Sequence, residues 1–118
     1  MAVSDYIRPG QIFMAMDPPQ DPTEGRKFDQ GKPDFTLLPW DAVEQVVRVL
    51  DYGAKKYARD NWRYVDDAHN RYMAAVFRHL STYMQGEEQD PETGINHLAH
   101  ACCSLLFVLA LTGEADDT

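Results

Sequence analysis

The longest apolar stretch of this chain runs from Ala99 to Leu111, and it sets the main constraint on the fold. Apolar side chains surround it nearly on all sides, and only His100 and Ser104 interrupt it. It is too short to cross a bilayer, which takes about 20 residues, so we expect a buried helix and no membrane contact. Three helices of the length that this chain allows do not cover such a helix well. We therefore predict an all-α fold, a small bundle of three main helices that is completed by homo-oligomerisation as a dimer or a tetramer.

Two earlier segments carry the spacing of amphipathic helices. Apolar residues recur at i, i+3, i+4 and i+7 over about residues 40–57 and again over about residues 67–85. The apolar positions are Val43, Val46, Val47, Leu50 and Ala54 in the first segment and Met73, Val76, Phe77, Leu80 and Met84 in the second.

The third helix is expected to open at Asp90-Pro91 or after a short lead, with Asp90 as its cap, and to reach about Leu111. Gly113 is expected to end it. At 118 residues the chain predicts one all-α domain over residues 26–113, preceded by an irregular arm at 1–25 and followed by an acidic tail at 114–118.

The surroundings of the protein follow from its cysteines and its first residues. Cys102 and Cys103 are adjacent within the apolar stretch, which indicates core residues rather than a disulfide or a metal knuckle. No charged and then apolar leader opens the chain, so no signal peptide is expected. A reducing, cytoplasmic setting is the prediction.

Charge is distributed unevenly along the chain. The net charge of −8 argues against binding to a nucleic acid polymer. All eleven Lys and Arg residues lie at or before Arg78, whereas the acidic residues after it have no basic residue among them. One part of the chain is thus suited to phosphate and the other to a cation. An acidic tail and solvated faces would produce the same counts.

Histidines and carboxylates gather between Arg78 and His100. His97 and His100 are i, i+3 neighbours at the start of a helix, where the helix dipole favours neutral rings that can bind a cation. Glu87 and Asp90 form a second pair of this spacing, and His79 lies on the preceding helix. We predict Glu87, Asp90, His97 and His100 as ligands of Mg²⁺ or Mn²⁺, Glu87 as a catalytic residue as well, and His79 as a ligand or general base.

Each of these residues also has a structural interpretation. A histidine on an apolar helix is more often a satisfied core residue, Asp90 can simply cap a helix, and Glu88 or Glu92 can be solvated. Five such residues in a short stretch favour a site. No H-E-x-x-H or C-x-x-C pattern supports them.

Basic and aromatic residues upstream are the candidates for substrate binding. The predicted phosphate contacts are Lys27, Lys32, Lys55 and Arg78, although Lys55 also suits the negative end of a helix dipole. Asp29 and Asn61 are predicted to read the nucleotide. Trp62 is a candidate for stacking on a base, but it is more often a core or interface anchor. No P-loop is present.

Several segments together carry a family resemblance over about residues 25–112. They are KFDQGKPDFTLLPWDAV, GAKKY, NW, RYMAAVFRHL and GEEQDPETGINHLAHA. The chain resembles the phage MazZ-like dATP/dGTP pyrophosphohydrolases, which are relatives of the MazG and HisE all-α nucleotide pyrophosphohydrolases. The resemblance implies a helical oligomer that uses divalent metals to convert a purine deoxynucleoside triphosphate to the monophosphate and pyrophosphate. In a phage it implies removal of dATP and supply of dGMP, within the host cytoplasm, for a genome that carries 2-aminoadenine.

The chain departs from the metal motif of the wider superfamily. That motif is E-x-x-E and E-x-x-D on successive helices, whereas the corresponding places here hold His79 with Thr82 and His97 with His100. The predicted mechanism is metal-assisted attack of water on a phosphorus of the triphosphate. The alternative function is a non-enzymatic acidic helical protein that binds a host or phage partner, in which case the histidines are core or interface groups.

Overall fold

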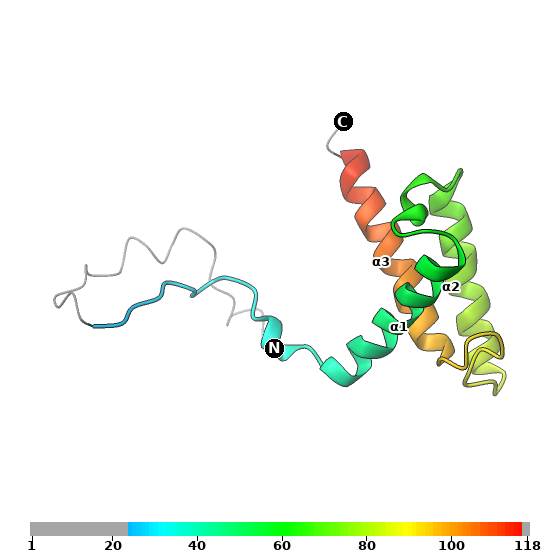
Figure 1. The fold of residues 1–118 in the computed structure, drawn as a ribbon, viewed down its shortest axis with the longest axis horizontal. Helices are drawn as coiled ribbons and strands as arrows, with labels where there is room; N and C mark the ends of the chain where they lie inside the picture. The colour runs from blue at the N-terminus through cyan, green and yellow to red at the C-terminus, as the bar shows by residue number, and fades with distance from the viewer. Residues whose placement is uncertain (1–23, 117–118) are drawn as a thin grey trace. The chain divides into compact units, whose positions relative to one another are not determined.

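Three α-helices dominate the computed structural model, which describes residues 24–116, with side chains described up to residue 113 (Figure 1). In chain order its elements are η2 (Phe35–Leu37), α1 (Trp40–Lys56), η3 (Asn61–Tyr64), α2 (Ala68–Met84) and α3 (His97–Asp116). Within this described range the only extended pairing is an isolated bridge between Gln89 and Asn96. The predicted all-α class with three main helices is confirmed.

The chain divides by its contacts into two units, Met1–Leu37 and Leu38–Thr118. In the first, a turn is closed by the Lys32 N–H, which donates to the Asp29 carbonyl at 3.2 Å. Nearly all of the predicted arm at 1–25 lies outside the described residues, and so does the end of the predicted acidic tail. The domain boundaries of the sequence analysis stay predictions.

The first two helices begin and end within a residue of their predicted bounds, because their ends carry clear local signals. Asp41 lies in the first turn of α1, and the Pro39 carbonyl accepts the backbone N–H groups of Ala42 and Val43, each at 3.0 Å. Gly86, at φ 107°, follows α2 in a conformation that favours glycine, and so stops that helix.

The predicted apolar stripe of α2 is only partly the buried one. Val76 is buried and Met73 is half-buried, but Phe77 and Met84 are exposed. The inward face is instead completed by Tyr72, Ala75, His79, Thr82 and Tyr83, which are all half-buried. The helix is apolar on two faces, and periodicity alone does not distinguish the face that meets α3 from the one that is exposed.

The third helix begins at His97, after a short lead from Asp90-Pro91, which was one of the two predicted alternatives. It differs from the prediction at its end, because it continues past Leu111 and through Gly113 to Asp116. Asn96 caps it, because the Asn96 Oδ1 accepts the Leu98 N–H at 2.8 Å. The Asp90 Oδ1 instead accepts the N–H groups of Glu92 and Thr93, at 2.8 and 3.3 Å, and so caps a turn in the loop before the helix.

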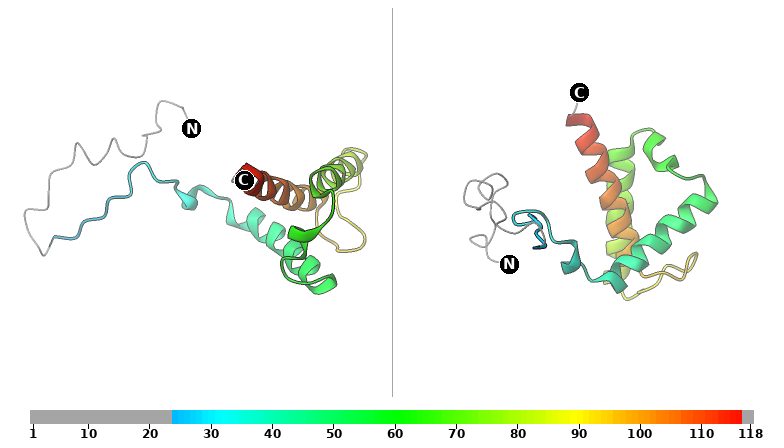
Figure 2. Two further views of the ribbon diagram at one scale, coloured as in Figure 1. Left: turned by 90° about the horizontal axis from the view of Figure 1, so that it is seen from above. Right: turned by 60° about the vertical axis from the view of Figure 1, so that its left-hand side comes forward.

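Helix α3 is the element that holds the second unit together, since it packs against both α1 and α2. Helices α2 and α3 lie side by side and run in opposite directions, while α1 crosses α3 at an angle (Figures 1 and 2). The buried apolar side chains of the described residues are small ones, namely Val76, Ala99, Ala101 and Cys103. Small side chains let helix axes approach closely, which brings the polar residues at the start of α3 against α2.

Much of the apolar surface of α3 stays exposed in this one chain. Leu105, Leu106 and Leu109 are 45%, 51% and 70% exposed, and Cys102, which was predicted to be a core residue, is exposed as well. Cys103 is buried as predicted, and burial raises the pKa of its thiol to about 11. None of the described helices is long and apolar enough to cross a membrane.

We expect Ala101→Leu to destabilise the fold by about 1–3 kcal/mol, because the added side chain has no room at this buried position. The free energy of unfolding in urea measures the effect. Ala42→Leu is the matched control, since residue 42 is exposed on α1 and should change stability by no more than about 0.5 kcal/mol. Equal effects of the two substitutions would contradict the packing described here.

Candidate functional site

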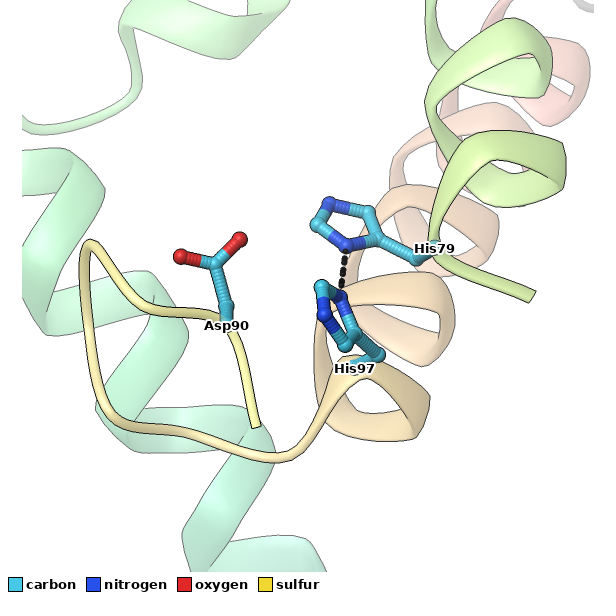
Figure 3. Close-up of side chains that lie close together, drawn as sticks. All are labelled: His79, Asp90 and His97. Atoms are coloured by element: carbon cyan, nitrogen blue, oxygen red, sulfur yellow. Dashed lines mark hydrogen bonds between the residues drawn. The ribbon is translucent and has the colours of Figure 1, made fainter. Parts of the chain in front are cut away.

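Two imidazole rings meet where α2 passes the start of α3. The Nδ1 atoms of His79 and His97 are 2.8 Å apart (Figure 3). His97 is 4% exposed and His79 is half-buried. Two unprotonated ring nitrogens repel each other at this distance, so a proton or a cation must lie between them. This is the closest polar contact between the two helices among the described residues.

The other nitrogen of His97 indicates which tautomer the ring adopts. His97 Nε2 lies 3.1 Å from the Glu87 Oε1, and a carboxylate accepts but does not donate. With the ring neutral, Nε2 carries the proton and Nδ1 presents a lone pair toward His79. A ring N–H donated to a carboxylate is the usual outer contact of a metal-binding histidine. In this arrangement Glu87 orients His97.

Asp90 completes a group of three possible metal ligands. One nitrogen of His79, one nitrogen of His97 and one carboxylate oxygen of Asp90 all lie within 4.8 Å of one another. Figure 3 shows the carboxylate across from the two rings. The turn that Asp90 caps uses Oδ1, whereas Oδ2 makes no hydrogen bond within the described part of the chain. An oxygen is thus free to bind a cation.

The distance between the two imidazole nitrogens of this group fits a divalent metal ion. Ligand atoms at about 2.1 Å from an ion and at right angles to each other lie about 3.0 Å apart. The 2.8 Å between the two imidazole nitrogens is close to that value. One oxygen and two nitrogens are a mixed donor set that suits Mn²⁺ and the later transition metals better than Mg²⁺.

His100 lies beside the cluster rather than within it. Its ring stacks on His79 with centroids 4.7 Å apart, and its Nε2 lies 2.7 Å from the Thr93 Oγ1. Burial lowers the pKa of both His79 and His100, and the neighbouring imidazoles lower them further against the opposing charge of Asp90. Both rings are therefore held in the neutral form that binds metals.

A second polar cluster joins the loop of residues 87–96 to α1. The Glu92 Oε1 accepts hydrogen bonds from the Tyr52 hydroxyl at 2.7 Å and from the Lys56 ammonium at 2.8 Å. These contacts, with Lys56 first, lower the pKa of Glu92, and the same carboxylate raises the pKa values of Lys56 and Tyr52. Spacing along the sequence gave no signal for this cluster, because its members are 36 and 40 residues apart.

A cavity of about 850 Å³ joins these groups. It lies between the C-terminal half of α1, η3, α2 and the first half of α3, and its size is within the range of small-molecule sites, roughly 300–1,000 Å³. His79, Asp90 and His100 line it, together with Arg78 and Lys56. Metal-type ligands and cationic side chains thus share one cavity.

The predicted substrate residues fall into separate places. Arg78, Asn61 and Trp62 line the cavity, whereas Lys55 does not and its neighbour Lys56 does. Adjacent helix positions point about 100° apart, so only one lysine of this pair faces the cavity, and the predicted phosphate contact of Lys55 stays a prediction. Lys27, Asp29 and Lys32 belong to the first unit, and their roles stay predictions.

Trp62 is fixed by ring contacts. It stacks on Phe107 of α3 with centroids 4.4 Å apart, and the Arg63 guanidinium lies 4.3 Å from the indole centroid. Tyr72 meets the same Phe107 edge-on at 5.1 Å. Trp62 therefore anchors η3 to α3, as its alternative interpretation held, while it also forms part of the cavity wall.

Comparison with known families identifies the group to which this sequence is assigned. The model of the family described as "dATP/dGTP diphosphohydrolase, N-terminal" matches residues 22–118. The chain belongs to this family. The match contains all the residues of both clusters, and it agrees with the resemblance drawn from the sequence segments.

A curated relative of the chain comes from a phage. The chain is 40% identical over 87 residues to a protein named "dATP/dGTP diphosphohydrolase" from Salmonella phage PMBT28. The aligned region is 74% of this chain but only 29% of the relative, so the chain spans less than a third of that protein. No solved structure matches.

The lowered pKa values of His79 and His100 make stability depend on pH. The unfolded chain takes up protons at about pH 6.5, before the folded rings do. The stability that the two neutral rings contribute is therefore fully present above that pH and is lost as the pH falls below it. We expect the urea midpoint of the metal-free protein to be lower at pH 5.5 than at pH 7.5.

The variant His79→Asn should show a smaller fall in midpoint between these two pH values. His69→Asn is the matched control, because His69 is exposed at the start of α2 and its replacement keeps the cluster intact. A midpoint that stays constant or rises on acidification would exclude burial of neutral imidazoles.

Proposed function

We propose that this chain catalyses the hydrolysis of dATP and dGTP to the corresponding monophosphate and pyrophosphate. The observation that supports the proposal is the shared cavity, which is lined by His79 and Asp90 of the possible metal-binding group and by Arg78, whose guanidinium makes no ion pair within the described residues. The family and the name of the phage relative supply the substrate class. Because the chain spans only part of that relative, the activity of this chain by itself is part of the proposal.

The proposed cofactor is Mn²⁺ or Mg²⁺, held by His79, Asp90 and His97. A bound divalent cation supplies positive charge to phosphate oxygens and makes a nearby water more acidic. Glu87 holds the His97 tautomer that leaves Nδ1 free, so its proposed role is to orient a ligand rather than to be one. His100 lies against His79 on the side of Thr93 and limits the movement of that ring.

The proposed phosphate contacts are the guanidinium of Arg78 and the ammonium of Lys56. Arg78 makes no ion pair within the described residues, and its planar group matches phosphate oxygens in pairs. Lys56 has three donors, of which the Glu92 carboxylate engages one. These cations stabilise the negative charge that develops on the phosphates during hydrolysis.

The aromatic end of the cavity is the proposed place of the base. On α3, Phe107 lies two turns beyond His100, which corresponds to about 10 Å along the helix axis. The Trp62 and Phe107 rings thus stand about one nucleotide length from the imidazoles. Asn61 borders this end, and its amide has both donors and an acceptor for a base edge.

Hydrolysis of dGTP by the full chain with Mn²⁺ tests the proposal. We expect ³¹P NMR to detect pyrophosphate and dGMP, and we expect EDTA to stop the reaction. Release of orthophosphate would indicate a phosphatase, and no turnover of any deoxynucleoside triphosphate would favour a protein that only binds partners. The proposed setting is a nucleotide pool remodelled for 2-aminoadenine DNA, and this setting requires that dATP is hydrolysed as well as dGTP.

Arg78→Met should lower kcat/KM for dGTP by about 100-fold, because a charge contact to the transition state is lost. Arg48→Met is the matched control, since Arg48 pairs with Glu44 on the exposed surface of α1 and does not line the cavity. Steady-state kinetics of both variants measure the difference. Equal activities of the two variants would remove Arg78 from the site.

We also propose that the chain forms a homo-oligomer through the exposed face of α3. Leu105, Leu106 and Leu109 lie along this helix with large exposed fractions, and exposed apolar surface of this kind is typical of subunit interfaces. Helices of a second copy would cover the face, as the all-round apolar stretch requires.

Leu109→Lys should shift the protein to the monomer, because a charge is then buried at the interface. Sedimentation velocity measures the mass at a fixed concentration. Lys55→Met, at an exposed position on α1, provides a control that should keep the mass of the wild type. A wild-type protein that sediments as a monomer would contradict the oligomer.

A further inference from the structure

Glu92 lies next to the proposed metal site without belonging to its ligand group. We propose that Glu92 is a positioning residue, which holds the loop of residues 87–96 against α1 and thereby sets the affinity of the His79, Asp90 and His97 site for a divalent cation. This inference rests on the metal site of the proposed function. The sequence alone gave Glu92 no role beyond the possibility that it is solvated.

Glu92 contacts α1 through two hydrogen bonds. Tyr52 and Lys56 are four residues apart, so their side chains lie on one face of the helix. Both donate to the same oxygen of Glu92, at 2.7 and 2.8 Å. They are the only hydrogen bonds between α1 and the loop of residues 87–96 in the described part of the chain.

The backbone of Glu92 is bonded to the side chain of Asp90. The Glu92 N–H donates to the Asp90 Oδ1 at 2.8 Å, so the residue that grips α1 also directs the carboxylate of the site. The turn is closed by the Gly94 N–H, which donates to the Asp90 carbonyl at 2.7 Å. We therefore expect a shift of the Glu92 backbone away from α1 to displace the Asp90 carboxylate.

Thr93 holds the same turn against α3, on the side away from α1. The Thr93 N–H also donates to Asp90 Oδ1, at 3.3 Å, and the Thr93 Oγ1 lies 2.7 Å from His100 Nε2 on α3. The turn is thus held between two helices, by Glu92 on the side of α1 and by Thr93 on the side of α3. Such supports around a first set of ligands commonly determine metal affinity.

Two other roles for Glu92 predict different effects. If Glu92 acted only by its negative charge, removal of the Lys56 positive charge would tighten cation binding, and removal of the Tyr52 hydroxyl would have no effect. If Glu92 were itself a ligand, release from Lys56 and Tyr52 would free it to bind the ion. A positioning role predicts weaker binding in both cases, because each donor helps to fix the turn.

The test is the affinity of the full chain for Mn²⁺ without nucleotide, measured from the electron paramagnetic resonance signal of the free ion. We expect Tyr52→Phe and Lys56→Met each to weaken binding by about fivefold, the typical effect of one lost hydrogen bond. Glu92→Gln should weaken it at least as much. Glu88→Gln is the matched control, because it removes the same charge from an exposed acid of the same loop, and it should change the affinity by less than about twofold.

A double variant gives a second measure of the same contact. The effects of Tyr52→Phe and Glu92→Gln should combine to less than the product of the two, because one removes and the other weakens the same hydrogen bond. Circular dichroism of every variant checks that the helices are retained.

The outcomes separate this inference from the function on which it rests. Unchanged or tighter Mn²⁺ binding in both Lys56→Met and Tyr52→Phe would overturn the positioning role and leave the metal site standing. Failure of the wild type to bind Mn²⁺ would overturn both. A wild type that binds Mn²⁺ in the predicted order of variants but hydrolyses no nucleotide would contradict the proposed function alone.

Discussion

The 2.8 Å approach of the His79 and His97 nitrogens is the contact on which the site depends. It requires α2 and α3 to pack closely, and the small buried residues Ala99, Ala101 and Cys103 make that packing possible. It also requires a proton or a cation between the rings, since the lone pairs of neutral imidazoles repel. Burial lowers the pKa of His79 and so favours the neutral form of its ring, which is the form that can bind a cation.

The loop of residues 87–96 converts this helix contact into a site. Its Asp-Pro-Glu-Thr-Gly segment forms a turn whose cap is the Asp90 carboxylate, and Gly94 takes a positive φ of 72° that closes the turn. The same few residues bring an oxygen to the imidazoles, an acid to α1 and a hydroxyl to His100. The possible metal ligands His79 and Asp90 line one cavity with the cationic side chains of Arg78 and Lys56, because this turn lies between helices from distant parts of the sequence.

Local signals predicted what depends on local interactions. The ends of α1 and α2 follow from Pro39, Asp41 and Gly86, and the gathering of histidines and acids between Arg78 and His100 followed from their positions alone. Contacts between distant segments could not be read in this way. The start of α3, the choice of Lys56 over Lys55 at the cavity and the bonds of Glu92 to α1 all depend on how the loop folds back. The assignment of Glu87 to His97 depends on a tautomer, which no spacing reveals.

This helical domain of the dATP/dGTP diphosphohydrolase family brings together two histidines and, from a turn held between two helices, one aspartate, and we propose these three residues as metal ligands. Anomalous diffraction at the manganese edge, from crystals of the full chain grown with Mn²⁺, tests the central claim most directly. The account predicts a peak bonded to one nitrogen of His79, one nitrogen of His97 and one oxygen of Asp90, at about 2.0–2.3 Å. A peak elsewhere would contradict this ligand set. So would a direct hydrogen bond between the two imidazoles, with no ion beside them, in crystals saturated with Mn²⁺.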